Sequence, residues 1–460
     1  MRLFALVLGC SLLVCVPAFA ATTGSAPGLV WGIPFIGVLL SIALLPIIAE
    51  RLWHRRMGLI TLFWIAALVM PQAAVRGPAA AWHGAWHAIL TEYLPFVTLL
   101  LALFAGGGGI LLRGGPGGTP LGNTVLLAAG SLFAGLMGTT GAAMVLIHPL
   151  LRANAHRRRK VHLVVFFILL VANAGGATTP LGDPPLYLGF LHGVPFFWPI
   201  DNLWRPLLVL ASVLLIAFYL IDRRFAAADP PRPPPERFRL RGWPNVGLVA
   251  VVVATVLTQG FWHPGRVTLL GQPIDIERLA GMGVFVAVTA ISALTTPRAV
   301  RQGNMFTWHP MEEVAKLFAA IFITIAPVLA MLEAGFEGPL AGVLRFTLDA
   351  NGQPVPAAYF WLTGLLSAFL DNAPTYLVFF GLAGGDPEHL TSDLRLVLEA
   401  ISSGAVFFGA LTYIGNAPNL MVRAIASHRG VRMPGFFGYM AWSCGLLLPL
   451  LVLLSVLFYG

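Results

Sequence analysis

Long apolar stretches constrain this chain more than any other feature of its sequence. A helix needs about 20 apolar residues to cross a ~30 Å hydrocarbon core, and about ten stretches meet that length. They are residues 30–49, 57–75, 93–113, 161–191, 203–221, 244–262, 279–297, 311–333, 394–425 and 436–459. Only 10% of the residues are charged, whereas soluble domains carry about 25%. A soluble enzyme is therefore excluded, and the sequence predicts an all-α polytopic membrane protein.

The first 20 residues have the pattern of a secretory signal peptide. Arg2 precedes an apolar stretch, and Ala18-Phe19-Ala20 is a small-x-small cleavage site. Cleavage would leave the mature N-terminus on the periplasmic side, and an uncleaved first helix is the alternative. The three cysteines, Cys10, Cys15 and Cys444, are too few and too scattered for a disulfide framework or a metal cluster.

Two further apolar stretches, residues 122–152 and 357–383, are interrupted midway by small and polar residues, at 137–141 and 370–374. Irregular backbone at membrane depth is typical of re-entrant hairpins, which enter and leave on the same side. With two hairpins and an outside N-terminus, the basic clusters fall on the cytoplasmic side, as the positive-inside bias requires. These clusters lie at 51–56, 152–160, 223–241, 298–301 and 423–432. They account for the basic excess without nucleic-acid binding.

The chain also contains an internal repeat. Residues 176–185 align with 409–418 at an offset of 233, which pairs Asp183 with Asn416. The same offset pairs Gly138 with Asp371, so each interrupted hairpin stands 45 residues before its interrupted helix. Because the hairpins would enter from opposite sides, the halves are predicted to be inverted-topology repeats, each with a re-entrant hairpin and a broken transmembrane helix.

This repeat predicts the organisation of the chain. The expected segments are a cleaved signal peptide at 1–20, N-terminal helices at 30–75, a first repeat at 89–221, a cytoplasmic Pro/Arg linker at 222–243, connecting helices at 244–297 and a second repeat at 311–460.

Asp183 and Asp371 are the ionisable residues predicted to lie nearest the bilayer centre. A carboxylate there is costly unless it is paired, protonated or coordinating a cation. A carboxylate that binds either Na⁺ or H⁺ is the minimal requirement for cation/proton exchange. Neutral oxygens that suit a hard cation could come from Thr139, Thr140, Thr178, Thr179, Asn372, Thr412, Asn416 and Asn419.

We expect Na⁺ at Asp183, Asp371, Asn372 and Asn416, with Asp183 also carrying the proton and Glu399 as the next candidate. The alternative is that Gly182-Asp183-Pro184-Pro185 is only a turn and that the Asn and Thr residues cap half-helices. Glu313, near a helix end, is predicted to be interfacial. Arg423 is predicted to be a positive-inside anchor, with anion binding as the alternative.

At these residues the chain resembles the NhaD-type sodium/proton antiporters, within an ion-transporter superfamily that includes citrate and dicarboxylate carriers and arsenite permeases. The resemblance is carried by residues 179–190, 370–376 and 412–419. It implies a fold of two inverted repeats and a homodimer. Carboxylate carriers of the superfamily tend to place Ser-Asn-Thr at the hairpin tips. Here the tips read Gly138-Thr139-Thr140 and Asp371-Asn372-Ala373-Pro374, and the acidic second tip disfavours an anionic substrate.

The sequence therefore predicts a secondary transporter, not an enzyme, that exchanges Na⁺ or Li⁺ for protons across a bacterial inner membrane without a cofactor. A sodium-coupled citrate, dicarboxylate or other anion carrier on the same scaffold is the alternative. A non-transporting membrane scaffold is a third class, for which inward Asp and Asn residues at both breaks would have no role.

Overall fold

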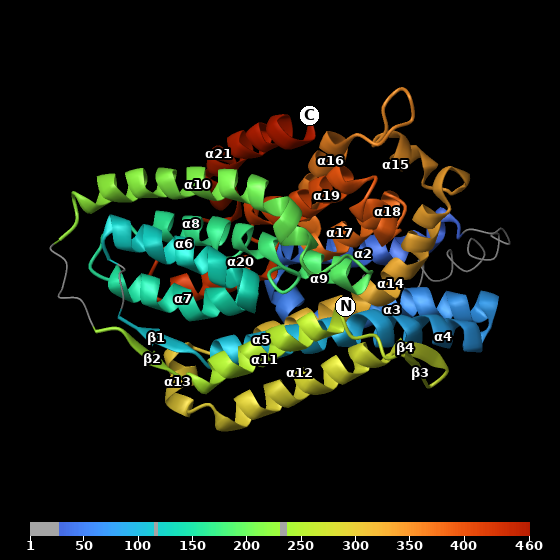
Figure 1. Cartoon of the computed structure of the whole chain (residues 1–460), viewed down its shortest axis with the longest axis horizontal. Helices are drawn as coiled ribbons and strands as arrows, with labels where there is room; N and C mark the ends of the chain where they lie inside the picture. Colours follow the sequence, from blue (N-terminus) through green and yellow to red (C-terminus); the bar gives the residue numbers. More distant parts are fainter. Residues whose placement is uncertain (1–26, 115–117, 231–236) are drawn as a thin grey trace.

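The computed structural model describes residues 27–114, 118–230 and 237–460, and most of these residues are helical (Figure 1). Within these ranges, nine helices are long and apolar enough to cross a membrane. The long helix α10 (Trp198–Ala226) exposes Ile216 and Leu220, as a lipid-facing helix does. The chain is thus an all-α multi-pass membrane protein. The predicted signal peptide at 1–20, with Cys10 and Cys15, lies outside the described residues.

Two groups of helices surround the two hairpins and the two broken helices. The first contains the short turn η1 (Leu29–Gly32), α2 (Ile33–Ile48), α3 (Glu50–Arg76), α4 (Pro78–Ala88), η2 (Ile89–Tyr93) and α5 (Leu94–Gly108). The second contains α11 (Pro244–Gln259), α12 (Ile276–Thr295), α13 (Arg298–Gly303) and α14 (His309–Glu333). Helix α14 packs against both α3 and α5, so the two groups meet beside the repeats.

The first interrupted stretch forms a hairpin, as predicted. Its arms are α6 (Pro120–Met137) and α7 (Thr139–Ala153), and the chain reverses at Gly138 with φ 79°. The Nδ2 atom of Asn123, in the first turn of α6, donates to Oδ1 of Asn154 just after α7, at 3.0 Å. Because this bond joins the two outer ends of the arms, the hairpin enters and leaves at the same end of the molecule.

The second interrupted stretch forms a matching hairpin from α16 (Pro356–Leu370) and α17 (Asn372–Leu382). Its turn residue, Asp371, has φ 77° and ψ 142°, close to the φ 79° and ψ 149° of Gly138. The rings of Tyr359 and Phe379, near the outer ends of the arms, have centroids 6.4 Å apart. The offset of 233 therefore relates two tips of the same backbone shape.

Each hairpin is followed by a broken helix. The first consists of α8 (Val161–Leu170), the turn η3 (Ala174–Thr178) and α9 (Pro184–Leu191), and the second of α19 (Arg395–Phe408), η5 (Gly409–Leu411) and α20 (Ala417–His428). The hydroxyl of Thr179 donates to the carbonyl of Gly135 at 2.5 Å. The hydroxyl of Thr412 donates to the carbonyl of Ala368, again 233 residues further on. The repeat found in the sequence is therefore also present in the structure.

The two hairpins enter from opposite ends of the molecule. The base of the first lies at the end of α10, where Asn123 Nδ2 donates to Asp222 Oδ2 at 2.9 Å. The base of the second lies near the start of α10, since the ring of Phe380 is 5.8 Å from that of His192, shortly before Trp198. The halves are therefore inverted, as predicted, and each closes with a long helix, α10 or α21 (Phe436–Leu454) followed by η6 (Ser455–Tyr459).

The residues around the predicted linker are more ordered than expected. Helix α10 continues to Ala226, and β2 (Arg239–Arg241) pairs antiparallel with β1 (Leu111–Arg113). A second strand pair, β3 (Arg266–Leu269) with β4 (Gln272–Asp275), joins α11 to α12. Helix α10 thus extends into the start of the predicted linker 222–243 and β2 lies near its end, while residues 231–236 lie outside the described ranges. Shorter elements complete the chain: η4 (Gly335–Glu337), α15 (Ala341–Arg345) and α18 (Pro387–Thr391).

A buried polar network fastens the base of the first hairpin to its neighbours. Asp222 is fully buried and pairs with the guanidinium of Arg157, itself 3% exposed. Its Oδ1 also lies 2.8 Å from Nε2 of His162, at the start of α8. A buried ion pair adds little net stability when intact, but removing one partner leaves an uncompensated charge. Asp222 thus holds together the outer ends of α6, α8 and α10.

Asp222→Asn should therefore destabilise the fold by about 3 kcal/mol, because it leaves the buried guanidinium of Arg157 with only the more distant carboxylate of Asp229, 4.0 Å from its Nε, as a counter-charge. Thermal unfolding in detergent measures this change. The matched control is Asp201→Asn, an exposed carboxylate in the first turn of the same helix, for which we expect less than about 0.5 kcal/mol. Equal effects of the two variants would show that the network does not stabilise this end.

Candidate functional site

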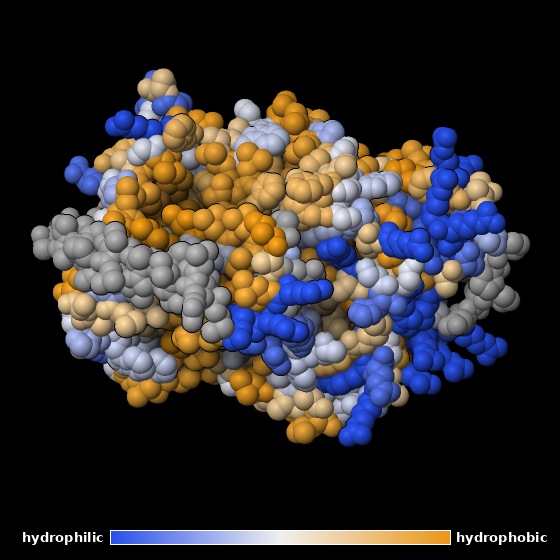
Figure 2. Space-filling model, turned by 180° about the vertical axis from the view of Figure 1, so that it is seen from behind, coloured by the Kyte–Doolittle hydropathy of each residue, from blue (hydrophilic) through white to orange (hydrophobic). Residues whose placement is uncertain are grey.

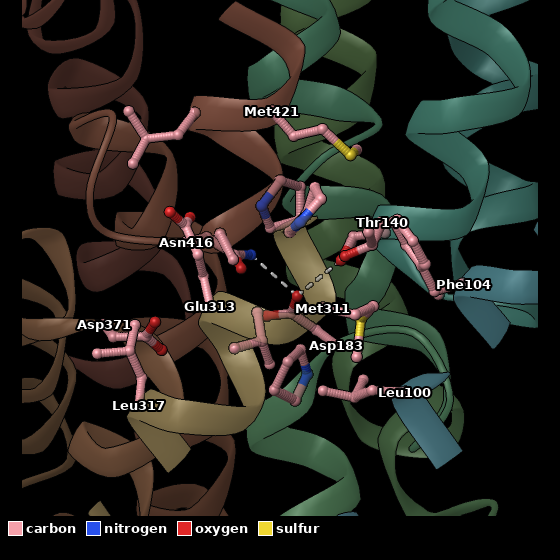
Figure 3. A pocket seen from close by; sticks show the side chains of 18 of the residues that line it. Leu100, Phe104, Thr140, Asp183, Met311, Glu313, Leu317, Asp371, Asn416 and Met421 are labelled. Carbon is pink, nitrogen blue, oxygen red and sulfur yellow. Dashed lines mark hydrogen bonds between the residues drawn. The ribbon is translucent and has the colours of Figure 1, made fainter. Parts of the chain in front are cut away.

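A cavity of about 520 Å³ lies where the two hairpin tips and the two broken helices meet (Figure 3). Residues of α2, α3, α5 and α14 complete its walls. Of the predicted site residues, Thr139, Thr140, Asp183, Asp371 and Asn416 line it directly. The structure thus brings residues more than 200 positions apart into one chamber.

Asp183 lies at the centre of this arrangement and is only 1% exposed. It occupies the N-cap position of α9, where Pro184 and Pro185 contribute no N–H groups. Its Oδ1 accepts hydrogen bonds from Thr139 Oγ1 at 3.1 Å and from Asn416 Nδ2 at 3.0 Å. Its Oδ2 accepts one from Asn372 Nδ2 at 2.5 Å. All three donors are neutral, and they come from both hairpin tips and from the second break.

Asn372 and Asn416 have the chemistry to serve two ligands. As arranged, each amide donates its N–H to the Asp183 carboxylate. The other atom of the Asn372 amide, Oδ1, is buried without a hydrogen-bond partner among the described residues. Amide oxygens are good ligands of hard cations, so rotating these amides would present oxygen to an ion beside the carboxylate.

Asp371 holds the second tip in a conformation that is rare for its residue type. It has φ 77°, in the left-handed half of φ space that favours glycine, and at the equivalent position the first tip has Gly138. Its Oδ1 accepts from the backbone N–H of Ala373 at 3.2 Å, and the side chain lines the cavity without a hydrogen bond to Asp183. Strained backbone of this kind is concentrated at functional sites.

Four of the predicted residues have a scaffolding role in this structure. Thr179 and Thr412 donate to backbone carbonyls of the hairpins, and Thr178 packs against Gly135. Asn419 Nδ2 donates to the carbonyls of Gly409 and Thr412, at 2.8 and 2.9 Å. These groups fix the shape of the breaks and do not line the cavity.

Sequence reasoning missed Asn173, which joins the two breaks. Its Nδ2 donates to Asn419 Oδ1 at 2.7 Å, and its Oδ1 accepts from Asn416 Nδ2 at 3.2 Å. Asn173 is fully buried between η3 and the end of α8. A lone Asn inside the apolar run 161–173 was the available signal, but it has no equivalent at the offset of 233, where Val406 stands.

Two residues that were not among the predicted site residues also line the cavity. Glu313, predicted to be interfacial, lines the cavity, and its Oε1 lies 3.3 Å from Nε2 of His309. Arg423, predicted to be an anchor, also lines the cavity and stacks over the ring of Tyr413 at 4.7 Å. Glu399 does not line it, and its Oε1 instead accepts from Arg395 at 2.9 Å.

The cavity extends from the tips toward one end of the molecule. Its lining includes Trp53, His309 and Ser427, from segments whose basic neighbours predict a cytoplasmic location. Two aromatic side chains lie beyond Asp183, on the helices that lead away from the first break and from the second hairpin tip. Tyr187 on α9 and Tyr376 on α17 are almost fully buried there. The lining thus extends from the hairpin tips toward the end where the basic clusters lie.

A family model described as putative citrate transport matches residues 24–459. The Na(+)/H(+) antiporter NhaD of Halomonas elongata is 24% identical over 322 residues, or 65% of this chain and 60% of the relative. NhaD of Alkalimonas amylolytica is 25% identical over 316 residues, covering 65% and 61%.

Sodium/proton antiporter 2 of Arabidopsis thaliana is 26% identical over 219 residues, which is 47% of this chain and 49% of the relative. The chain thus spans about 60% of the length of the two bacterial antiporters. The family model covers nearly the whole chain, so its match includes both broken helices of this protein.

At the first break, the backbone at Gly182 packs closely against the backbone at Gly176. A Cβ atom on Gly182 would lie 2.2 Å from the carbonyl oxygen of Gly176, so the backbone must move to accept it. Gly182→Ala should therefore cost about 2 kcal/mol of stability and displace Asp183. In the matched control Gly247→Ala, nothing lies within 4 Å of the added Cβ. Thermal unfolding compares the two, and an undisturbed Gly182→Ala variant would contradict the described break.

Proposed function

The chain belongs to the family described as putative citrate transport and is similar to NhaD antiporters, and we propose that it is a secondary transporter that exchanges Na⁺ or Li⁺ for protons. One observation carries the proposal. Asp183 is buried among neutral donors from both repeats. A carboxylate in such a place needs a proton or a cation to neutralise its charge. Binding of one then excludes the other, which couples their movements.

In this proposal Asp183 carries the proton in one half of the cycle and Na⁺ in the other. Asn372 and Asn416 donate N–H groups to the Asp183 carboxyl group when no cation is bound and present their oxygens when the cation is bound. Asp371, in the same cavity, supplies a second negative charge, which favours a cation over an anion. A hard monovalent cation is the species that this oxygen set suits.

The shape of the cavity supports an inward-facing state. The lining reaches toward the end where the basic clusters lie, whereas Tyr187 and Tyr376, beyond Asp183, are almost fully buried. Because the repeats are inverted, exchanging the arrangements of the two hairpins would open the opposite side instead. We place the protein in a bacterial inner membrane with a periplasmic mature N-terminus, acting as a homodimer. The related bacterial NhaD proteins support the bacterial assignment.

The alternative is a sodium-coupled carrier of citrate, a dicarboxylate or another anion. Two observations favour it: the description of the matching family and the guanidinium of Arg423 in the cavity lining. However, Asp183, Glu313 and Asp371 line the same cavity, so acidic groups outnumber Arg423. Everted vesicles separate the two functions. Sodium-dependent collapse of a pH gradient without organic anion supports exchange, whereas sodium-dependent uptake of labelled citrate or succinate overturns it.

Asp183→Asn should abolish exchange, because an amide cannot alternate between a proton and a cation. In the wild type, the apparent Na⁺ affinity should weaken as pH falls, by up to about tenfold per unit for one displaced proton. The measurement is Na⁺-dependent dissipation of a pH gradient at several pH values. The matched control is Glu312→Gln, an exposed carboxylate on α14 that does not line the cavity. An Asp183→Asn protein that still exchanges with the same pH profile would place the proton elsewhere.

Asp371→Gly separates the shape of the second tip from its charge. Glycine accepts the backbone angles of this position, as Gly138 does at the first tip, so we expect membrane insertion and folding to persist. Exchange should nevertheless be lost, and Asp371→Asn should lose it as well. Folding is followed by size-exclusion elution and thermal unfolding, and exchange by the vesicle assay. Normal exchange in either variant would remove the Asp371 carboxylate from the cation site.

A further inference from the structure

A second cavity, of about 620 Å³, lies at the basic end of the molecule and shares no lining residue with the first. Figure 2 shows hydrophilic side chains gathered at this end, where α10 ends and α6 begins in Figure 1. The walls come from the connection between α7 and α8, the end of α10 and the connection between α20 and α21. Both repeats therefore contribute to it.

The charges of this cavity are of one sign. Its described lining contains no Asp or Glu and five basic side chains: Arg157, Arg158, Arg159, Lys160 and Arg432. The ion pair with Asp222 neutralises Arg157. Among the described residues, the side chains of the other four form no ion pair. Because like charges that line one cavity repel and no described acidic side chain lines it, the cavity favours an anionic occupant.

The rest of the wall is apolar. Phe225, Pro434 and Trp442 line it, and the guanidinium carbon of Arg159 lies 5.1 Å from the centroid of the Phe225 ring. Close by, Leu220 on α10 and Phe437 on α21 are exposed by 58% and 75%. Exposed apolar side chains thus stand on the same helices α10 and α21 that contribute Phe225 and Trp442 to the cavity, so its occupant should combine an anionic group with an apolar body.

We propose that this cavity binds the phosphate-bearing headgroup of an anionic phospholipid, with its acyl chains along α10 and α21. Basic pockets between membrane helices on the cytoplasmic side recognise such headgroups. The phosphate would lie between Arg159 and Lys160 of the first repeat and Arg432 of the second. By offsetting their repulsion, it stabilises the contact between the two repeats at this end. The first turn of α8, which starts at Val161 in the cavity wall, adds the positive end of its dipole.

The test is lipid binding to the delipidated protein in a neutral detergent. Cardiolipin and phosphatidylglycerol should bind and raise the unfolding temperature, whereas phosphatidylcholine should not. The triple variant Arg159→Gln, Lys160→Gln, Arg432→Gln should lose about fivefold in affinity for each charge removed, or about a hundredfold in all. Arg157 is left in place because its ion pair with Asp222 stabilises the fold.

The matched control removes three charges from the same end but outside the cavity: Arg223→Gln, Arg224→Gln and Arg237→Gln, all exposed. Equal losses in the two triple variants would show diffuse attraction and overturn the proposal. Inorganic phosphate that binds as tightly as the lipids would reassign the cavity to a free anion. Failure of both anionic lipids to bind would also overturn it. If the triple variant does not fold, Arg432→Gln alone should lose about fivefold.

Discussion

The burial of one carboxylate, Asp183, is the constraint on which the rest of the structure depends. Its side chain is 1% exposed, and its three hydrogen-bond donors are a hydroxyl and two amides. Those donors come from the first tip, the second tip and the second break, so both repeats must meet at this point. The breaks, with their closely packed glycines, let the chain reach it. Burying the charged carboxylate costs free energy, and an exchangeable ion that neutralises the charge offsets this cost.

The symmetry of the repeats explains why two aspartates among the described residues, Asp183 and Asp371, line the cavity. At the broken helices Asp183 is matched by Asn416, and the two side chains hydrogen-bond to each other. At the tips Gly138 is matched by Asp371, with nearly the same backbone angles. Each pair of equivalent positions therefore contributes one carboxylate and one uncharged residue. Two carboxylates at equivalent positions, such as 183 and 416, would lie close together and repel each other. In this arrangement one carboxylate lies at a broken helix and the other at a hairpin tip.

Much of the fold could be predicted from the sequence, because long apolar runs and their interruptions specify membrane helices directly. The spacing of the two interruptions also indicated the inverted repeat, since Gly138 and Asp371 fall at the same offset as Asp183 and Asn416. The short strands β1 to β4 could not be predicted, as three or four residues carry too little periodicity. The extension of α10 to Ala226 was missed for a similar reason, because charged residues end an apolar run before they end a helix.

The site was only partly accessible to sequence reasoning. Asp183 and Asp371 stood out because carboxylates are rare at membrane depth. The roles of the Asn and Thr residues depend on where each side chain points, and sequence does not specify this. Asn419 and Thr412 therefore proved to bond to the backbone, while Glu313 and Arg423 reached the cavity from positions that resemble helix ends.

The most direct test of the central claim is proton release on cation binding. Purified protein in a weakly buffered, neutral detergent solution receives NaCl, and a pH electrode records the change. If Asp183 binds Na⁺ or H⁺ but not both, Na⁺ should release up to about one proton per site. Choline chloride should release none, and Asp183→Asn should abolish the signal. Sodium binding that releases no proton at any pH would contradict the account.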